Sequence, residues 1–394
     1  MPRVFLSHNT ILSSYGFTSK SAISQIEHEV SGLQLIQDER LLSTPFYSSR
    51  IDRVTLDGRF HKLQLDPSGF AHTPIKDKQP YTPLEKILIC SLADTLQQSG
   101  ISLTERVGLI ISTTKGNIDV LEADSVFPQE RAYLPVLGKS ITSFFGFKND
   151  AIVLSNACVS GILAVAVAKG LILQGKYDHV FVVAGDLVSR FILSGFQAFQ
   201  ALSKEPCRPY CKTRSGINIG EVGASILVTQ DPNHLIEESV ALIGEATCND
   251  ANHISGPSRT GEGLYRSVIR ALEQAGVSAS QIDYISAHGT ATPFNDEMEA
   301  KAFNRVGLQH TPLNSLKGYF GHTLGASGLL ETIIGMHALQ KNTLFASKGF
   351  QELGVSEPLN IIKGTTPRKM TLFLKTASGF GGCNTAAIFQ KIGQ

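Results

Sequence analysis

The sequence predicts an α/β fold built around a mostly parallel sheet, and three observations lead to this prediction. Short apolar runs that are typical of buried strands alternate along the chain with longer segments of helical pattern. The composition suits a compact enzyme better than a fibrous or disordered chain, because 42% of the 394 residues are hydrophobic and 36 are glycine. A unit made of a strand, a small-residue turn and an apolar helix occurs in both halves of the chain.

The individual elements follow from this alternation. Strands are expected at short apolar runs, at residues 106–112, 151–154, 180–184, 224–229, 282–287 and 371–376. Helices are expected at longer periodic runs, at residues 83–98, 161–174, 261–275, 296–303 and 326–340. Residues 40–80 are rich in Pro, Asp, Lys and Ser, so we expect surface loops there.

The repeated unit indicates a duplication. Residues 151–175 contain a strand, a turn that carries Cys158 and an apolar helix, while residues 313–339 contain an extended segment, a glycine-rich turn that carries His322 and an apolar helix. Two similar halves would place their equivalent helix starts side by side about a pseudo-dyad, which would bring Cys158 and His322 together. We expect the boundary in the polar stretch 230–239, so that residues 1–235 form the first half and residues 236–394 the second.

Bulk properties exclude several classes of function. The formal charge is +1, from 35 Lys and Arg against 34 Asp and Glu, so no global signal points to nucleic acid or to an anionic membrane. The N-terminus lacks a secretory signal, and no charge-free apolar run reaches the roughly 18 residues of a membrane span. Only Cys207 and Cys211 are close among the scattered cysteines, and no second pair completes a zinc site. A reducing, cytoplasmic setting is expected.

Cys158 lies at a predicted strand-to-helix junction, in Ser-Asn-Ala-Cys-Val-Ser-Gly. The unpaired N–H groups and the positive dipole end of a helix N-terminus lower the pKa of a thiol and favour the nucleophilic thiolate. The alternative is that Cys158 is a small core hydrophobe, since free cysteine is among the most buried residue types. Only partners elsewhere in the chain can decide between these interpretations.

Two histidines are candidate partners. His288 follows a predicted strand at the sheet edge where open α/β sheets place ligand chemistry, and Gly289 marks the end of that strand. His322 lies in a glycine-rich turn between Lys317 and Glu331, a pair that could set its charge state and orientation. The alternatives are a structural histidine in the first case and a solvated ion pair beside the second.

A further candidate is the glycine-rich turn Gly-Phe-Gly-Gly-Cys-Asn around Phe380, which follows a predicted buried strand. Its glycines free the backbone, so that an N–H group can point at a developing oxyanion. The alternative interpretation is an ordinary glycine turn.

Together these four segments resemble the β-ketoacyl-acyl-carrier-protein synthases, the decarboxylating condensing enzymes of the thiolase-like superfamily. Asn-Ala-Cys-Val-Ser-Gly around Cys158 is similar to the nucleophile turn of that family. Ala-His-Gly-Thr-Ala-Thr-Pro-Phe-Asn-Asp around His288 and Lys-Gly-Tyr-Phe-Gly-His-Thr-Leu-Gly-Ala-Ser-Gly around His322 are similar to its two histidine motifs, and the turn around Phe380 to its C-terminal loop. The resemblance runs from about residue 83 to the end and is weak before that.

The resemblance implies a duplicated thiolase-like fold with two βαβαβαββ halves in five layers, αβαβα. It also implies acyl transfer from a carrier protein's phosphopantetheine thioester to Cys158, followed by a decarboxylative Claisen condensation. His288 and His322 would hold the malonyl thioester carbonyl and stabilise the enolate, while the N–H groups of Cys158 and Phe380 would form the oxyanion hole. No cofactor other than these carrier-bound thioesters is expected.

Supporting roles are implied in the same way. Lys317 and Glu331 would support the second histidine. Thr290 and Thr292 would contact the pantetheine arm, and Phe380 would gate the acyl pocket.

The chain departs from the usual family pattern in places. Asn156 replaces Thr or Ser in the nucleophile turn, Cys211 stands where Asp is common, and Cys383 replaces a common Thr. Thiolases and enzymes that prime with coenzyme A thioesters would carry Cys or Asn in place of His322, so a carrier-protein-dependent elongating enzyme is favoured. Residues 40–80 and 117–145 differ most from the family, which leaves fatty acid and polyketide or polyene pathways open.

Two other functions remain open alongside a self-sufficient homodimeric enzyme. One is a non-catalytic, chain-length-determining partner subunit, although such relatives typically lose the nucleophile that Cys158 retains here. The other is an active subunit that works only in a heterodimer with a related ketosynthase subunit.

Acyl-carrier protein is the expected partner. An acidic carrier protein needs a basic surface, and four cationic residues cluster in the sequence, namely Lys204, Arg208, Lys212 and Arg214. The alternative is that these residues belong to a solvated loop.

Overall fold

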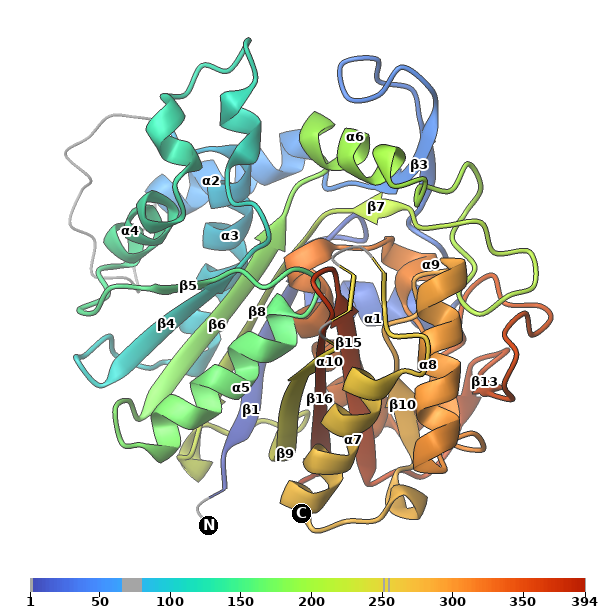
Figure 1. Ribbon diagram of the computed structural model, residues 1–394. Helices are drawn as coiled ribbons and strands as arrows, with labels where there is room; N and C mark the ends of the chain where they lie inside the picture. Colours follow the sequence, from blue (N-terminus) through green and yellow to red (C-terminus); the bar gives the residue numbers. More distant parts are fainter. Residues whose placement is uncertain (1–2, 66–79, 251, 254–255, 394) are drawn as a thin grey trace.

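The computed structural model describes residues 3–65, 80–250, 252–253 and 256–393 (Figure 1). Its main feature is an 11-stranded sheet whose strands lie in the order β13-β11-β10-β15-β16-β9-β1-β8-β6-β4-β5. In chain order these strands are β1 (Phe5–Leu12), β4 (Val107–Ser112), β5 (Ile152–Leu154), β6 (His179–Asp186), β8 (Val222–Thr229), β9 (Val240–Asn249), β10 (Tyr284–Ser286), β11 (Pro312–Asn314), β13 (Asn360–Ile361), β15 (Leu372–Gly379) and β16 (Cys383–Lys391).

The described residues also form two smaller sheets. One contains β2 (Gln34–Ile36), β3 (Phe46–Ser49) and β7 (Ile219–Gly220), and the other contains β12 (Thr343–Leu344) and β14 (Thr366–Pro367).

The large sheet repeats one topology. When the main strands of each half are numbered in chain order, β5-β4-β6-β8-β1 and β11-β10-β15-β16-β9 both follow the order 3-2-4-5-1. In each half the fifth strand is antiparallel to its neighbours, whereas the strands on the other side of the sheet are parallel. The halves meet where β1 pairs with β9, through Phe5 opposite Ala241 and Leu6 opposite Val240. The predicted duplicated fold is therefore confirmed.

Helices form the remaining layers (Figure 1). α5 (Ser160–Leu173) and α10 (Ser327–Lys341) pack against each other, and both contact strands from both halves, so they form the central layer. α3 (Pro83–Ser99) covers β1, β6 and β8 on one outer face, and α7 (Glu262–Ala275) covers β9 and β16 on the other. These contacts produce the five layers αβαβα. The further helices include α1 (Ser19–Glu27), α2 (Arg53–Leu65), α4 (Leu134–Phe145), α6 (Arg190–Ala198), α8 (Pro293–Val306) and α9 (Lys317–Phe320).

The central helices cross at two glycines. A Cβ atom on Gly161 would lie 2.6 Å from the backbone nitrogen of Leu329, and a Cβ atom on Gly328 would lie 2.6 Å from the backbone nitrogen of Ile162. These reciprocal contacts place the first turns of α5 and α10 side by side, which is the symmetric arrangement that the internal repeat predicts. The turns that precede both helices therefore open toward the same point.

The outer helix α3 illustrates how local sequence sets an element's bounds. Thr82 accepts a hydrogen bond from the N–H of Glu85, while the Glu85 carboxylate accepts one from the N–H of Thr82. This capping box satisfies backbone donors at the helix start, and Gly100 ends the helix in the left-handed conformation. Most of the helix is buried, because it lies directly on the first half sheet.

The prediction of surface loops over residues 40–80 is wrong for part of that stretch. The structure has β3 at Phe46–Ser49 and α2 at Arg53–Leu65. Leu56 and Phe60 are four residues apart, lie on one side of α2 and are buried. These apolar side chains, together with the ion pairs of Arg59 with Asp94 and of Lys86 with Asp57, dock α2 onto α3, so composition alone is misleading here. Residues 66–79 lie outside the described residues.

Two other features bear on the sequence-based expectations. The polar stretch 230–239 connects β8 to β9, and the exact division into halves there stays a prediction.

Within the described residues, no helix combines the length and hydrophobicity required to cross a membrane.

Candidate active site

Cys158 lies in a tight turn between β5 and α5. Ala157 has a φ of 45°, a left-handed conformation that is costly for a residue with a side chain. Ser160 holds the turn, because its hydroxyl accepts a hydrogen bond from the N–H of Asn156 at 2.7 Å and donates one to the carbonyl of Ala157 at 2.6 Å. The strained turn brings the Cys158 thiol out of the strand and toward the second half of the molecule.

The thiol of Cys158 is buried, and this changes the expectation about its pKa. Burial raises the pKa of Cys158 to about 12, although Lys317 and a hydrogen bond from the backbone N–H of Phe380 act in the opposite direction. The lowered pKa expected from the helix dipole is therefore wrong in direction. Burial therefore favours the protonated form of this thiol.

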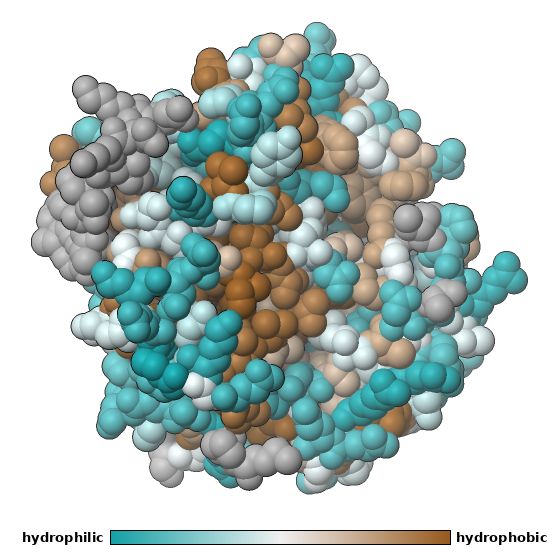
Figure 2. All heavy atoms as spheres, turned by 60° about the vertical axis from the view of Figure 1, so that its left-hand side comes forward, coloured by the Kyte–Doolittle hydropathy of each residue, from teal (hydrophilic) through white to brown (hydrophobic). Residues whose placement is uncertain are grey.

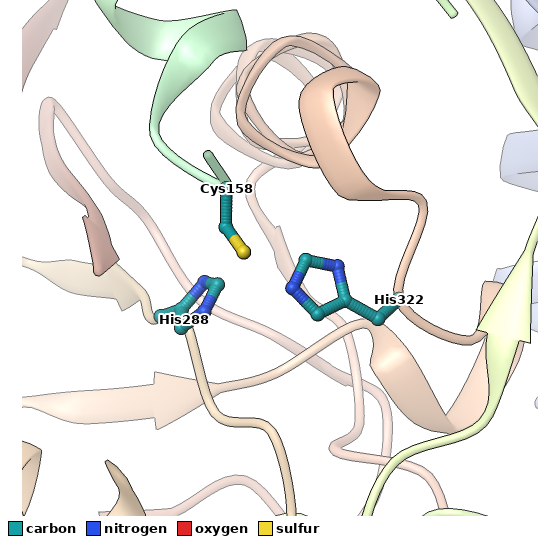
Figure 3. A group of neighbouring side chains, drawn as sticks. All are labelled: Cys158, His288 and His322. Carbon is teal, nitrogen blue, oxygen red and sulfur yellow. The ribbon is translucent and has the colours of Figure 1, made fainter. Parts of the chain in front are cut away.

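Cys158 and the two candidate histidines meet at one point. The Cys158 sulfur points between the imidazole rings of His288 and His322 (Figure 3). Sγ and one ring nitrogen from each histidine all lie within 4.8 Å of one another. The ring centroids are 5.2 Å apart, with the planes at 80°. The loop after β10, the turn before α10 and the turn before α5 each supply one of these side chains.

A buried carboxylate that the sequence did not single out holds the His288 turn. Glu299, on α8, accepts hydrogen bonds from the N–H groups of His288 at 2.9 Å and Gly289 at 2.7 Å. The hydroxyl of Tyr210 donates to the same carboxylate at 2.9 Å. Asp296, one turn earlier, accepts from the N–H of Thr290 at 3.0 Å. The only sequence signal was two acidic residues on a helix after the histidine motif.

Lys317 fixes the orientation of His288. Its ammonium donates to the His288 carbonyl at 2.5 Å and lies 3.4 Å from Nδ1 of the same residue. It also forms an ion pair of 2.9 Å with Oε1 of Glu331. An ammonium only donates, so Nδ1 of His288 accepts and the ring proton belongs on Nε2. The direct contact of Lys317 is with His288, and the support of His322 by Lys317 stays a prediction.

His322 has the same tautomer for a different reason. The backbone N–H of Leu324 donates to its Nδ1 at 3.1 Å, and the hydroxyl of Ser327 lies 3.0 Å from the same atom. The proton of the neutral ring therefore belongs on Nε2. Nε2 is buried and has no hydrogen-bond partner among the described residues. A buried donor without a partner is costly, so this one is available for a ligand oxygen.

Both histidines are held in the neutral state. Burial lowers the pKa of His288 and of His322 well below the ordinary value, and the positive charges of Lys317 and Lys375 lower both further. Neutral imidazoles can donate from Nε2 without adding a positive charge to the site. The two rings are suited to bind one oxygen atom that becomes negative during a reaction.

The loop that carries Phe380 lies against Cys158. The backbone N–H of Phe380 is hydrogen-bonded to the Cys158 thiol. A Cβ atom on the neighbouring Gly379 would lie 3.0 Å from the Cys158 nitrogen and 3.1 Å from the sulfur of Cys383. A side chain at this position would be crowded, so the glycine favours this close approach, which places the backbone amides of residues 158 and 380 next to the thiol.

A cavity of about 420 Å³ opens onto the three residues, and the expected pantetheine contacts line it. Thr290 and Thr292 are both in its wall, with their hydroxyls 2.8 Å apart. Phe380 is also in the wall, where its ring packs on Phe196 at 5.7 Å and on Phe199 at 5.2 Å. These two phenylalanines, on and just after α6, were not found in the sequence, because only the tertiary contact reveals them.

The predicted basic patch is only partly present. Lys204 is exposed, Arg208 is half-buried, and exposed Lys212 pairs with Glu352 at 3.0 Å. The Arg214 guanidinium is largely buried and donates to the carbonyl of Gly354 at 2.6 Å. Including Arg214 in an exposed docking patch was therefore wrong, because backbone carbonyls and the nearby carboxylate of Asp296 hold its charge inside the molecule.

Two groups of side chains within the described residues have the spacing of metal ligands. One is Cys158, His288 and His322, and the other is the half-buried set of His179, Asp231 and His234. We interpret the first as a nucleophile beside two N–H donors, since its unpartnered Nε2 is a donor in the neutral tautomer described above. That the chain holds no resident metal stays a prediction.

Comparisons with known proteins give a consistent result. The family model described as "Beta-ketoacyl synthase, N-terminal domain" matches residues 18–233, and "Beta-ketoacyl synthase, C-terminal domain" matches residues 240–351. A curated relative, "3-oxoacyl-[acyl-carrier-protein] synthase 2" of Vibrio harveyi, is 25% identical over 424 residues, which cover 100% of this chain and 99% of the relative. "Putative polyketide beta-ketoacyl synthase 1" of Streptomyces halstedii is 28% identical over 337 residues, 76% of this chain and 80% of the relative.

Solved structures share the fold. A chain in the structure of a ketosynthase in complex with its chain length factor, from Xenorhabdus doucetiae, superposes with a TM-score of 0.87 at 24% identity. The match covers 99% of this chain and 98% of that chain. The whole length of the chain is therefore accounted for by one architecture.

Proposed function

Because the chain belongs to the β-ketoacyl synthase family and is an acyltransferase of the condensing type, we propose that Cys158, His288 and His322 carry out a decarboxylative condensation. Cys158 takes an acyl group from the phosphopantetheine thioester of an acyl-carrier protein. A malonyl thioester on a second carrier protein then supplies two carbons. The product is a β-ketoacyl thioester on the carrier protein.

The first half-reaction is acyl transfer. The Cys158 sulfur attacks the thioester carbonyl carbon and loses its proton, and the carbonyl oxygen becomes negative. The N–H groups of Cys158 and Phe380 donate to that oxygen, and each such donor contributes on the order of 10²-fold in rate. The carbon–sulfur bond to pantetheine then breaks, and the leaving thiolate takes up a proton. A protonated resting thiol agrees with this sequence, because the enzyme gains and loses no net proton.

The second half-reaction is decarboxylation and condensation. The bond between the malonyl carboxylate and the neighbouring carbon breaks, carbon dioxide leaves, and the electron pair forms an enolate. Nε2–H of His288 and Nε2–H of His322 donate to the enolate oxygen. The enolate carbon attacks the acyl carbonyl on Cys158, the bond to the sulfur breaks, and the Cys158 thiolate takes up a proton.

One observation carries this proposal. Nε2 of His322 is a buried donor without a partner, in a cavity that also holds the Cys158 thiol and the ring of His288. Its Nδ1 is committed to the N–H of Leu324 at 3.1 Å, so Nε2 must be the donor. A substrate oxygen between the two rings would satisfy this donor and would place the reacting carbons next to the sulfur.

Two variants separate the half-reactions. Cys158→Ala removes the acyl acceptor but leaves both histidines, so it should abolish acyl loading and still release carbon dioxide from malonyl-carrier protein. His322→Ala should still accept an acyl group on Cys158, but its decarboxylation rate should fall by about 10²-fold or more. Mass spectrometry of the acyl enzyme and a carbon dioxide assay measure the two. Condensation that survives Cys158→Ala, in the protein alone or with a partner subunit, rejects the assignment.

The same assays test the carrier. The curated relative from Vibrio harveyi is named for acyl-carrier protein, so we propose that acyl-carrier protein delivers both thioesters here as well. Loading and decarboxylation should proceed with carrier-bound thioesters. Activity with coenzyme A thioesters alone would reject the proposed partner.

We also propose that the enzyme works as a dimer, either with a second copy or with a related ketosynthase subunit. β5 is the edge strand of the large sheet, and edge strands are open to pairing. Half-exposed apolar side chains of β5 and α5 lie beside that edge, and we call them the edge patch: Ile152, Leu154, Leu163, Val167 and Leu171. Figure 2 shows a hydrophobic band down the face on this side of the molecule. A ketosynthase with the same fold is in complex with its chain length factor, which supports the heterodimeric form.

A non-catalytic, chain-length-determining subunit is the weaker alternative, since the nucleophile, both histidines and Lys317 are arranged for chemistry. The pathway can be that of fatty acids or polyketides, as relatives carry both kinds of name. All six cysteines are free thiols, which fits the proposed cytoplasmic location.

A further inference from the structure

A second buried lysine shares the carboxylate that pairs with Lys317. Lys375, on β15, places its ammonium 2.8 Å from Oε2 of Glu331, while Lys317 lies 2.9 Å from Oε1. The side chains of both lysines are fully buried, and that of Glu331 is 3% exposed. One carboxylate therefore bridges two ammonium groups in a region without contact to bulk water.

Lys375 has the partners that a charged amine needs. Its ammonium donates to the carbonyls of Ser286 at 3.1 Å and Thr376 at 2.5 Å, in addition to its contact with Glu331. The two carbonyls accept hydrogen bonds from the amine, and Oε2 of Glu331 is its ion-pair partner without being a hydrogen-bond acceptor. A neutral amine would lose this ion pair. Burial lowers the pKa of Lys375, and the charge of Glu331 opposes this change. The geometry favours the charged form.

Two positive charges share one carboxylate in this cluster, since Lys317 and Lys375 both contact Glu331. The next carboxylate is that of Glu299, which accepts from the N–H of His288 and acts electrostatically on both lysines. A single Lys–Glu pair would suffice to hold the turns together. The second buried lysine next to the histidines is therefore a candidate for a functional role.

The other charged groups near the histidines each have hydrogen-bond or ion-pair partners close by. Glu299 and Asp296 of α8 face the His288 turn, and backbone N–H groups and the hydroxyl of Tyr210 bind them. Arg214 lies 3.7 Å from Asp296. On the side of Cys158, buried Asp186 accepts from the N–H groups of Thr114 and Gly325. The Tyr284 hydroxyl donates to Asn314 at 2.7 Å.

We propose that Lys375 is a positioning residue for decarboxylation: it pairs with the second oxygen of Glu331 and supplies a positive charge that favours an enolate between His288 and His322. This inference rests on the proposed function above. Lys375 does not touch the substrate. It acts through Glu331 and Lys317, which orient His288, and through its charge, which opposes protonation of both imidazoles.

The two half-reactions differ in their need for this charge. Decarboxylation leaves a negative enolate at the histidines, the site nearest to the lysine cluster. Acyl transfer develops its negative charge at the N–H groups of Cys158 and Phe380 instead. Loss of Lys375 should therefore slow decarboxylation selectively, whereas general loosening of the fold would slow both.

The test is Lys375→Met, which keeps most of the length of the side chain and removes the charge. We expect release of carbon dioxide from malonyl-carrier protein to fall by about tenfold or more, with acyl loading of Cys158 within about twofold of the unaltered protein. The acid limb of the decarboxylation profile should also move to higher pH, because the histidine pKa values rise when the neighbouring charge is removed. Equal loss in both half-reactions, or an unchanged decarboxylation rate, overturns the inference.

Lys169→Met is the matched control. Lys169 is another buried lysine in an ion pair, with Glu245, but it lies in the middle of α5, away from the histidines. Replacement of Lys169 should change the rates of acyl loading and decarboxylation by the same factor or leave both unchanged. If Lys375→Met does not fold, Lys375→Gln replaces it, because it removes the charge and keeps N–H donors for the carbonyls of Ser286 and Thr376. The same selective loss of decarboxylation is expected, and equal loss in both half-reactions overturns the inference. An unaltered protein without decarboxylation rejects the proposed function itself.

Discussion

At the scale of single residues, the group that contacts Nδ1 of each histidine decides that the ring proton lies on Nε2. Nδ1 of His288 faces an ammonium and Nδ1 of His322 accepts a backbone N–H, so both rings present Nε2–H to the cavity. The histidines lie 34 residues apart in the sequence, and different elements supply their partners. The common outcome, two neutral rings with the proton on Nε2, is a property of the contacts and not of either motif alone.

Glu299 provides a test at this scale. Glu299→Gln replaces one acceptor oxygen by an NH₂ group, which would face the N–H groups that the carboxylate now binds. We expect the His288 turn to loosen, with a loss of about 1–3 kcal/mol in the free energy of unfolding and a fall of about tenfold or more in decarboxylation. Urea unfolding and the carbon dioxide assay measure these effects.

Tyr210→Phe is the control for that substitution, since it removes one hydrogen bond to the same carboxylate and adds no donor. Its effect should be smaller on both measurements. A Glu299→Gln protein that decarboxylates at the original rate would show that this carboxylate does not position His288.

At the scale of elements, the crossing of α5 and α10 brings the two halves of the site together. Each helix begins just after a turn that carries one reacting residue, and each has a glycine at the point of contact. Backbone-to-backbone packing leaves no space for a side chain. The distance between Cys158 and His322 therefore depends on two residues that carry no chemistry themselves.

Gly161→Ala tests this crossing. The new Cβ atom would lie 2.6 Å from the backbone nitrogen of Leu329, so the helices must separate. Overpacking of this kind costs about 1–3 kcal/mol, and we expect a matching loss of stability together with slower condensation. Thermal unfolding and the full condensation assay measure the two.

Gly170→Ala is the matched control, because this glycine is also in α5 but has no atom within 4 Å of the position that a Cβ would take. It should stabilise the helix by about 0.5–1 kcal/mol and leave condensation unchanged. Similar behaviour of the two variants would contradict a special role for the crossing.

At the scale of the whole molecule, the duplicated sheet has one edge at β5 and the other at β13. The β5 edge adjoins the turn that carries Cys158 and the apolar edge patch. A partner that covers this edge would bury the patch and extend the sheet, and it would lie close to the nucleophile turn. The proposed dimer would thus influence the active site through a few residues at β5.

Val167→Glu tests the dimer. The substitution places a charge in the half-exposed apolar surface of α5, which should weaken association strongly because an unpaired charge at a buried interface is costly. Gel filtration with mass detection should give twice the mass of the chain for the unaltered protein, alone or with a related subunit, and the mass of one chain for the variant.

Val54→Glu introduces the same charge at a valine that is 81% exposed on α2, and it should not change the mass. A monomeric unaltered protein, tested alone and with ketosynthase-type subunits, would reject the proposed assembly.

Much of the molecule could be predicted from the sequence, because some information is local. Apolar runs located the strands around β4, β6 and β15 and the helices α3, α5 and α10, since burial imposes a pattern on neighbouring residues. β9 and β16, which connect the half sheets through the pairs with β1 and β15, were not predicted as strands. Polar residues such as Glu245 in β9 and Asn384 in β16 obscure their pattern, so long-range pairing and not local composition decides their structure.

By itself, the sequence determined which residues are proposed to carry the chemistry, because Cys158, His288, His322 and the Phe380 loop lie in short motifs that resemble those of one family of condensing enzymes. Only the tertiary structure decided how these residues are held. It assigned Lys317 to His288, brought Lys375 and Glu299 into the site and enclosed Arg214. The physical reason is that hydrogen bonds and charge pairs act over a few ångströms in space, and residues far apart in the chain come within that range only after folding.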